Sequence, residues 1–371
     1  MVAAFILAIV AGAAYQSRYK IHIADFTWSR FVDSVSRADG WLLLLSVVAI
    51  YGCYALRALR WQRFSRHIGV AKFGSTYSAT LMGFTAIFVL GRAGEPVRPL
   101  LLARKDRLPV SSMFGIFFLE RFVDFAAAVG LVCVSLLVFP RQLSAVGADM
   151  TWVGQAGHGA RLLIAALLIL VAALVYYRMH GAEALDRRLA GWRSAGAMRR
   201  RVAAVVSGFS EGLAAIRSIP DLIAAIVYST AHWGLAALVY LWVTRAFAGE
   251  AVGFQMNFPG AMLLLAVTVI GSALQLPGIG GGAQIASFIG LTKIFGFSPE
   301  PAVAIAVVLW LITFASCTLA GIPLLIHEGL SVGELRKLAR AEEQAEEAGT
   351  HLAVPEAGPS EVVSGDRRGD A

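Results

Sequence analysis

The chain is poor in charged residues and in cysteine. Lys, Arg, Asp and Glu make up 15% of its 371 residues, whereas a soluble domain carries nearer a quarter. Its three cysteines lie far apart in apolar runs, and no CxxC or Cys/His spacing suggests a metal site. A phosphate-binding loop ending in GKS or GKT is also missing, which argues against ATP binding. The sequence therefore predicts no metal, no cofactor and no soluble catalytic domain.

Apolar sequence is what the chain has in abundance. Hydrophobic residues make up 58% of it, and its mean hydropathy is +0.69. Several apolar runs approach or exceed the roughly 20 residues that span a bilayer as a helix, which predicts an all-α polytopic membrane protein. The net charge of +8 then does not indicate nucleic-acid binding. The runs are about 1–14, 41–56, 76–90, 110–139, 161–177, 221–248, 258–276, 279–297 and 300–327.

Basic residues are unevenly distributed among the connecting segments. Residues 57–75, 91–109 and 178–220 are rich in Arg and Lys, whereas 140–160 has a single arginine and 249–259 has no basic residue. Because basic loops of membrane proteins stay in the cytoplasm, the first three segments are predicted to lie inside and the last two outside.

This topology divides the chain into three parts. Residues 1–327 are predicted to form the membrane domain, with about six to eight spanning helices, and 178–220 a cytoplasmic basic loop. Residues 328–371 are predicted to be a charged, cytoplasmic and partly disordered tail. The run 1–14 is either a first helix or a truncated signal anchor. The segment Arg187–Arg201 either attracts anionic lipid headgroups or only fixes the orientation of the chain.

Two apolar segments are too short, or too interrupted by glycine and proline, to form simple membrane-spanning helices. Residues 76–90 have cytoplasmic segments on both sides, which predicts a re-entrant element. Residues 258–297 are interrupted by QLPGIGGG, which favours a second re-entrant hairpin over two separate crossings. A broken element in each half, facing opposite sides, is typical of an inverted-repeat transporter. The alternative is that both breaks are ordinary turns between spans.

Three charged residues interrupt the apolar run 113–139. A charge at the bilayer centre costs roughly 2.5–3.5 kcal/mol, so Glu120, Arg121 and Asp124 must face water, protein or one another. Glu120 and Asp124 are four residues apart and share one helix face. They either serve a polar substrate or form structural ion pairs with Arg92, Arg98 or one another.

Two glycine-rich breaks provide further candidate residues. Glu95 and Arg98 follow two glycines in GRAGEPVR, where free backbone amides and an arginine would make an anion pocket. The alternative is a cytoplasmic turn with solvated charges. In PGIGGG, which begins at Pro277, Gly278 and Gly280 suggest a backbone site at a broken membrane helix. His232 is expected to be hydrogen-bonded within the bundle rather than catalytic.

These motifs resemble a known family. The stretch GRAGEPVRPLLLARKDRLPVSSMFGIFFLERFVDFAA resembles the G-x-x-G-E-x-x-R … E-R-x-x-D signature of the lysylphosphatidylglycerol synthase transmembrane-region family, which are flippase-like membrane proteins. The stretch PGIGGGAQIASFIGLTKIFGFSPEPAVAIAVVLW is similar to its P-G-G-x-G-x-x-E … F-G … A-x-A block. The resemblance spans about residues 41–327. It implies inverted re-entrant elements and action on lipids: some members move aminoacylated phosphatidylglycerol between leaflets, and others are associated with polyprenyl-linked glycans or hopanoids.

Two positions depart from the family pattern. Gln284 stands where the family often has Glu, and Trp310 where it often has Arg, which argues against an aminoacyl-lipid substrate. The aminoacyl-transferase domain of the fused synthases is not part of this sequence, so synthesis of the lipid is not expected. The substrate-binding residues that we expect from the motifs and the resemblance together are Glu95, Arg98, Glu120, Arg121, Asp124, Pro277, Gly278, Gly280 and Gln284.

The predicted function is translocation of an amphipathic, phosphate-bearing lipid between the leaflets of the inner membrane. The protein is expected to be multi-pass, with a cytoplasmic C-terminus and without enzymatic activity. The alternative is a membrane enzyme or accessory subunit in lipid-glycan, aminoacyl-lipid or hopanoid metabolism.

Overall fold

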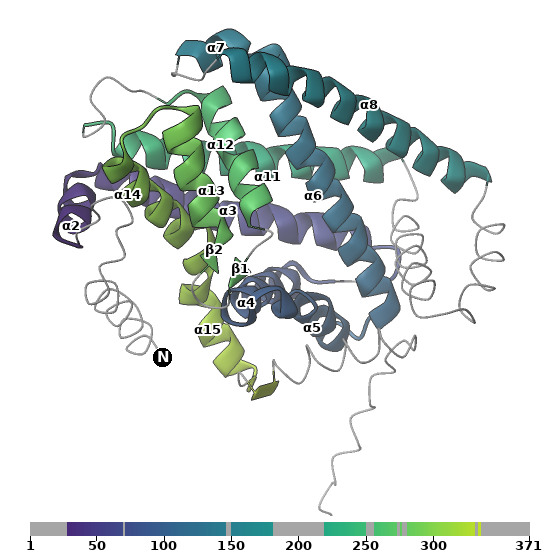
Figure 1. The fold of residues 1–371 in the computed structure, drawn as a ribbon. Helices are drawn as coiled ribbons and strands as arrows, with labels where there is room; N and C mark the ends of the chain where they lie inside the picture. The colour runs from purple at the N-terminus through teal and green to yellow at the C-terminus, as the bar shows by residue number, and fades with distance from the viewer. Residues whose placement is uncertain are drawn as a thin grey trace, which may run out of the picture.

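The computed structural model describes residues 28–69, 71–145, 150–180, 219–249, 256–272, 275–276, 280–330 and 333–334, and these are largely helical (Figure 1). The helices, in chain order, are α2 (Trp28–Arg37), α3 (Gly40–Ser65), α4 (Phe73–Leu90), α5 (Val97–Lys105), α6 (Val110–Val138), α7 (Pro140–Ala145), α8 (Met150–His180), α11 (Ile219–Ala246), α12 (Phe258–Gly271), α13 (Gly282–Ile289), α14 (Pro299–Trp310) and α15 (Cys317–His327). A 3₁₀ turn (Gly91–Gly94) follows α4, and π turns follow α13 (Gly290–Ile294) and α14 (Leu311–Ala315). Two-residue strands β1 (Gln275–Leu276) and β2 (Gly280–Gly281) pair antiparallel.

The prediction of an all-α polytopic membrane protein is confirmed. Within the described ranges, five helical stretches are long and apolar enough to cross a membrane: Gly40–Ser65, Phe73–Gly94, Ser112–Val138, Pro220–Ala246 and Pro299–His327. The last of these comprises α14, a π turn and α15. The run 161–177 lies within α8, and the run 1–14 lies outside the described residues.

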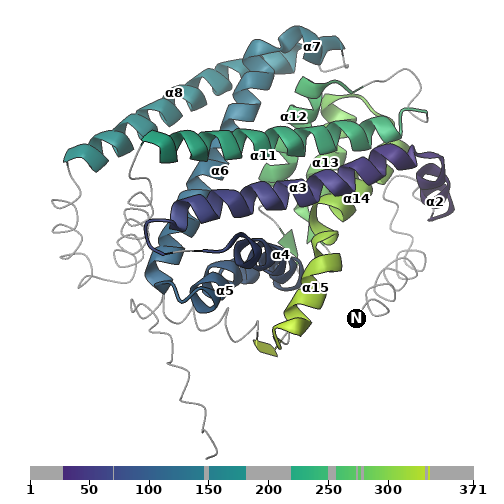
Figure 2. The ribbon, with the colours of Figure 1, turned by 180° about the vertical axis from the view of Figure 1, so that it is seen from behind.

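Helices α3 and α11 form an antiparallel pair. Figure 2 shows them side by side, crossing α6. At one end of the pair the amide of Asp39 donates to the carbonyl of Ala246, 2.9 Å away, and the Asp39 carboxylate caps α3. The assignment of residues 57–65 to a connecting segment is wrong, because α3 continues to Ser65. Arg57 and Arg60, three residues apart, lie on one face of this extension and are buried.

The chain reverses at the first glycine-rich break. Helix α4 ends at Leu90, the following Gly91 has a φ of 67° that suits glycine, and α5 then returns along α4 (Figure 1). Gly94 lies directly against the backbone of Ala86, so a Cβ there would collide with that carbonyl group. Gly83 accommodates the returning helix, since a Cβ on it would lie 2.6 Å from Cβ of Arg98. The depth of this hairpin in a bilayer stays a prediction.

A second hairpin is built from α12 and α13. The hydroxyls of Thr268 and Ser287 are 2.7 Å apart, and Gly271 lies against Ala286 and Gly282. The two helices have 14 and 8 residues, which is too short to cross a bilayer. Strand β1, in the break between them, contacts the 3₁₀ turn of the first hairpin. The two breaks therefore meet, although an inverted-repeat relation between the halves stays a prediction.

The helix ends form two groups. Lys105 at the end of α5 donates to Glu328 after α15 (2.6 Å) and to Ser78 near the start of α4 (3.2 Å). A hydrophobic cluster that includes Phe64, Leu108 and Leu325 joins the end of α3 and the start of α6 to the same group. At the other end, α7 contacts α12. The end of α3, the start of α4, the end of α5 and the end of α15 thus lie at one end of the bundle. The loop 178–220 and most of the tail 328–371 lie outside the described residues.

Cysteine labelling tests the re-entrant hairpin. In a background without Cys53, Cys133 and Cys317, cysteines replacing the exposed Lys72 and Arg104 should both react with an impermeant maleimide only from the cytoplasmic side. A cysteine at the exposed Ala93, in the turn between α4 and α5, should not react from the outside. Labelling of Ala93→Cys from the outside, with Lys72→Cys still labelled from the cytoplasm, would show that α4 crosses the membrane.

Candidate functional site

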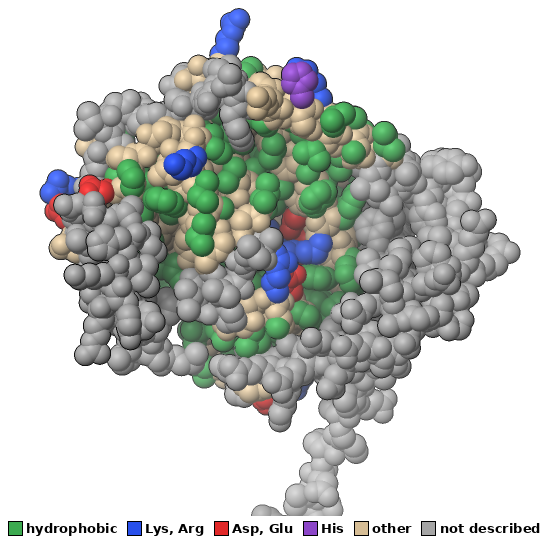
Figure 3. Space-filling model, in the orientation of Figure 1, with side chains coloured by type: hydrophobic (Ala, Val, Ile, Leu, Met, Phe, Trp, Pro, Cys, Tyr) green, Lys and Arg blue, Asp and Glu red, His purple; other side chains and the backbone are tan. Residues whose placement is uncertain are grey.

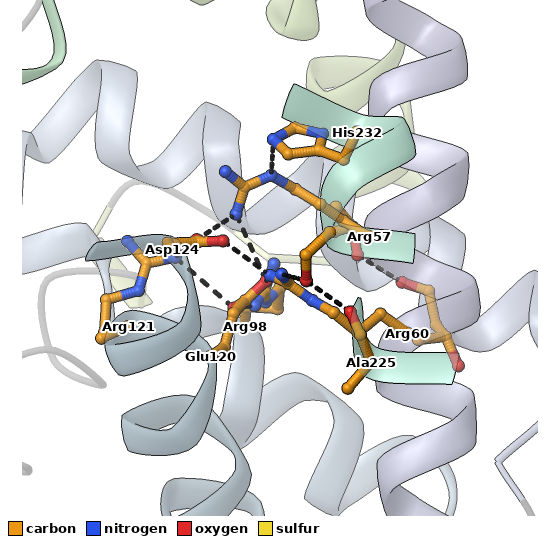
Figure 4. Close-up of polar contacts among 11 residues, drawn as sticks. Arg57, Arg60, Arg98, Glu120, Arg121, Asp124, Ala225 and His232 are labelled. Carbon is orange, nitrogen blue, oxygen red and sulfur yellow. Dashed lines mark hydrogen bonds and ion pairs between the residues drawn. The ribbon is translucent and has the colours of Figure 1, made fainter. Parts of the chain in front are cut away.

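Six charged side chains from three helices meet inside the bundle (Figure 4). We call this group the arginine cluster. It contains Arg57 and Arg60 of α3, Arg98 of α5, and Glu120, Arg121 and Asp124 of α6. Helix α11 lies beside it and contributes His232 and Ser229.

Glu120 is the centre of the arginine cluster. Its side chain is completely buried, and four guanidinium groups surround it. Oε1 accepts hydrogen bonds from Arg60 at 2.7 Å and from Arg57 at 3.2 Å. Oε2 forms an ion pair with Arg98 and a longer one, of 3.4 Å, with Arg121. One carboxylate therefore orients arginines that come from three different helices.

Asp124 binds three of the same arginines from the next turn of α6. Its Oδ1 accepts from Arg60 and its Oδ2 from Arg57, each at 2.9 Å, and Arg121 lies 3.5 Å from Oδ2. The spacing of four residues places the two carboxylates on the same helix face, as the sequence predicts.

Helix α11 and nearby aromatic rings support the guanidinium groups. Nε of Arg57 donates to Nε2 of His232 at 3.2 Å, so the imidazole is neutral with its proton on Nδ1. Nη1 of Arg60 donates to the hydroxyl of Ser229 at 2.8 Å. Arg98 stacks on Trp61, with 4.3 Å from Cζ to the ring centroid. His232 is thus hydrogen-bonded within the bundle, as its place in an apolar helix suggests.

Exposure divides the arginine cluster into two layers. The inner layer, Arg60, Arg98 and Glu120, is almost completely buried. The outer layer consists of Arg57 and Asp124, whose side chains are 10% and 11% exposed, and Arg121, which is 40% exposed. On the face shown in Figure 3, hydrophobic side chains predominate, and one small group of basic and acidic side chains lies in the middle. A ligand that approaches the cluster would meet the outer layer first.

The arginine cluster carries more positive than negative charge. Four guanidinium groups face two carboxylates, and this leaves two positive charges. Burying charge without a counter-ion is costly, so the arrangement favours the binding of an anion. Both carboxylates are occupied by arginines, and no group of three His, Cys, Asp or Glu side chains among the described residues could hold a metal ion.

Only some of the substrate-binding residues predicted from the sequence lie in the arginine cluster. It brings Arg98, Glu120, Arg121 and Asp124 together, but Glu95 pairs with the exposed Arg92 at 3.4 Å in the turn before α5. Gly280 lies in β2, and Oε1 of Gln284 accepts from the amide of Gly281 at 2.6 Å, capping α13. Trp310 packs against Phe88, with 5.7 Å between the ring centroids. Pro277 and Gly278 lie outside the described residues.

The sequence interpretation missed Arg57 and Arg60. Both were assigned to a cytoplasmic loop because basic residues follow an apolar run there. The signal that could have identified them is the pattern YALRALRW, in which two arginines three residues apart share a helix face between apolar neighbours.

A family model described as the lysylphosphatidylglycerol synthase TM region matches residues 1–321. The chain belongs to this family. None of the curated proteins matches the chain significantly. The match includes every residue of the arginine cluster, and membership of the family supports a lipid-related function in a multi-pass membrane protein.

Removing the central carboxylate should destabilise this family member. Glu120→Gln leaves four guanidinium groups with one carboxylate, and breaking a buried pair of this kind costs about 3–5 kcal/mol. Glu95→Gln makes the same chemical change in an exposed pair, which is worth about 0–1 kcal/mol. Thermal unfolding of the purified variants in detergent should therefore show a much lower transition temperature for Glu120→Gln. Equal transition temperatures would contradict the central role of Glu120.

Proposed function

We propose that this protein translocates an amphipathic, phosphate-bearing lipid between the two leaflets of the cytoplasmic membrane. The observation that carries the proposal is the surplus of positive charge in the arginine cluster, to which α3 and α6, both long and apolar enough to span a membrane, contribute five of the six side chains. The headgroup would pass along the cluster while the acyl or prenyl tails stay in the bilayer.

The outer layer is suited to bind phosphate. Guanidinium binds phosphate through two parallel hydrogen bonds, which makes arginine the preferred residue for such anions. Arg121 makes the longest contacts of the four arginines, at 3.4 Å to Glu120 and 3.5 Å to Asp124. Its buried Nε has no hydrogen-bond partner among the described residues. We therefore assign the first contact with the headgroup to Arg121.

The position of the arginine cluster favours transport. Moving a phosphate through hydrocarbon is very unfavourable, and buried cationic side chains reduce that barrier. The two hairpins meet at their breaks near α4 and α5, the elements that carry Arg98 and the ring of Phe84 to the cluster. Broken elements that meet in this way are where secondary transporters hold their substrates. Small movements of one hairpin against the other would open the cluster to either leaflet.

An enzymatic function is less well supported by the geometry. A general base needs a carboxylate or imidazole that is free to take a proton from the substrate. Glu120 and Asp124 accept hydrogen bonds from arginines, and Nε2 of His232 accepts one from Arg57. The groups that could act as bases are therefore occupied, whereas guanidinium donors are in surplus.

Orientation and surface attachment belong to the same proposal. The basic segments predict that the end carrying Lys105 and Glu328 faces the cytoplasm, which would place the C-terminus inside. The segment Arg187–Arg201 would add attraction to anionic lipids on that side.

Transport should depend on the guanidinium of Arg121 rather than on its charge alone. In proteoliposomes, translocation of a tail-labelled phospholipid, measured by dithionite quenching, should be about tenfold slower for Arg121→Lys, because lysine cannot bind phosphate bidentately. Arg121→Gln should be slower still. The exposed Arg141, at the start of α7, provides the control variants Arg141→Lys and Arg141→Gln, which should keep the wild-type rate.

The transition temperatures of the Arg121 variants distinguish a loss of transport from a loss of folding. Both Arg121 variants should purify with a wild-type transition temperature, since the side chain is partly exposed and its ion pairs are long. Wild-type transport rates in folded Arg121→Lys and Arg121→Gln would refute the assignment of Arg121 to the headgroup.

A further inference from the structure

We infer that the headgroup is doubly charged: a phosphate monoester or a diphosphate, rather than the singly charged phosphodiester of most phospholipids. This inference rests on the proposed function and specifies the chemical class of its substrate. It follows from the charge and the hydrogen-bond donors of the arginine cluster.

The arginine cluster has two more positive charges than its carboxylates neutralise. Each layer of the cluster has two arginines and one carboxylate, which leaves one positive charge per layer. His232 is neutral because it accepts from Arg57. A phosphate monoester carries about −1.5 to −2 at pH 7 and a diphosphate at least as much, whereas a phosphodiester carries only one negative charge. The doubly charged headgroup would neutralise both layers.

Several other carboxylates of the described residues have partners of their own. Glu95 pairs with Arg92, Glu328 with Lys105, and the buried Asp221 with Arg63, Arg66 and His67. None of these carboxylates contacts an arginine of the cluster in the described part of the chain. Among the described residues, these carboxylates therefore do not offset the surplus of the cluster.

Among the described residues, the arginine cluster also has more hydrogen-bond donors than acceptors. Nε of Arg60, Nε of Arg121 and Nδ1 of His232 are buried nitrogens without a hydrogen-bond partner among the described residues. The oxygens of Glu120 and Asp124 are already occupied by arginines. Buried donors normally have partners, so among the described residues the cluster has fewer acceptors than donors. A monoester offers three strongly accepting oxygens, and a phosphodiester has only two that are unesterified.

The two arginines of the outer layer lie where a phosphate could reach both. Arg57 and Arg121 both approach Oδ2 of Asp124, at 2.9 and 3.5 Å, on the exposed side of the cluster. The contacts of Arg57 with His232, Glu120 and Asp124 use its Nε and Nη1. The two guanidinium groups of the outer layer can therefore contact one phosphate together while Asp124 keeps them in place.

Binding of three soluble-chain probes tests the inference. The probes are dioctanoyl phosphatidic acid as the monoester, dioctanoyl phosphatidylglycerol as the diester, and farnesyl diphosphate. At about pH 7.5 the full-length protein in detergent should bind the monoester at least about tenfold more tightly than the diester, because an additional charge-assisted hydrogen bond in a buried site is worth that much. At about pH 5 the monoester loses its second charge and its advantage should disappear, whereas the diphosphate should keep its own.

The diester serves as the internal control, since its charge does not change between these two pH values and it reports any titration of the protein. Retention of the advantage at about pH 5 by farnesyl diphosphate but not by phosphatidic acid would distinguish charge from headgroup size. Arg121→Gln removes one of the two surplus charges, so the ratio of monoester to diester affinity should fall at least about threefold. Arg141→Gln should leave the ratio unchanged.

Equal affinity for monoester and diester at about pH 7.5 would overturn the inference, and so would a ratio that does not change with pH. If the diester still bound in an Arg121-dependent manner, the proposed function would stand with a phosphodiester substrate. If no phosphate-bearing probe bound, both would fail. The pH dependence of the wild-type ratio decides the question even if Arg121→Gln does not fold.

Discussion

The ion pairs of Glu120 with four arginines are the interaction on which the rest of the structure depends. They join α3 to the later helices α5 and α6 at a point inside the hydrophobic bundle. Each arginine alone would be very costly in an apolar environment, and the carboxylate alone would be too. The helices can therefore pack in this way only if the charged residues meet. A buried ion pair is often no more stabilising than well-packed apolar residues, so stability alone does not account for an extended charged cluster.

The first hairpin, α4 and α5, brings Arg98 to the arginine cluster. Arg98 reaches Glu120 because the chain turns back after α4, and that reversal requires Gly94 against the backbone of Ala86. Gly83 then leaves room for the start of the Arg98 side chain. The second hairpin, α12 and α13, contacts the same turn through β1. The glycine-rich breaks thus act on the site through geometry, by bringing one arginine to the cluster and by joining the two halves of the chain.

The membrane fold and part of the site could be predicted from sequence because they depend on local patterns. Apolar runs identify the spans, and the spacing of Glu120 and Asp124 defines their common face. Arg57 and Arg60 could not be assigned, because basic residues after an apolar run have the same pattern whether they end a helix or continue it. Only the partners, 60 or more residues away, decide between the two. Proximity in sequence was equally misleading for Glu95, which faces Arg92 although Arg98, three residues further, enters the cluster.

The central claim is that the arginine cluster holds the phosphate of a lipid. The most direct measurement is mass spectrometry of the lipids that remain bound to the protein after purification, compared with the lipids of the membrane from which it came. The account predicts enrichment of a phosphate-bearing lipid in the wild type, and loss of that enrichment in Arg98→Lys and Arg121→Lys, which keep the charge but not the planar guanidinium. Enrichment of an uncharged lipid such as a hopanoid, at the same level in both variants, would contradict it.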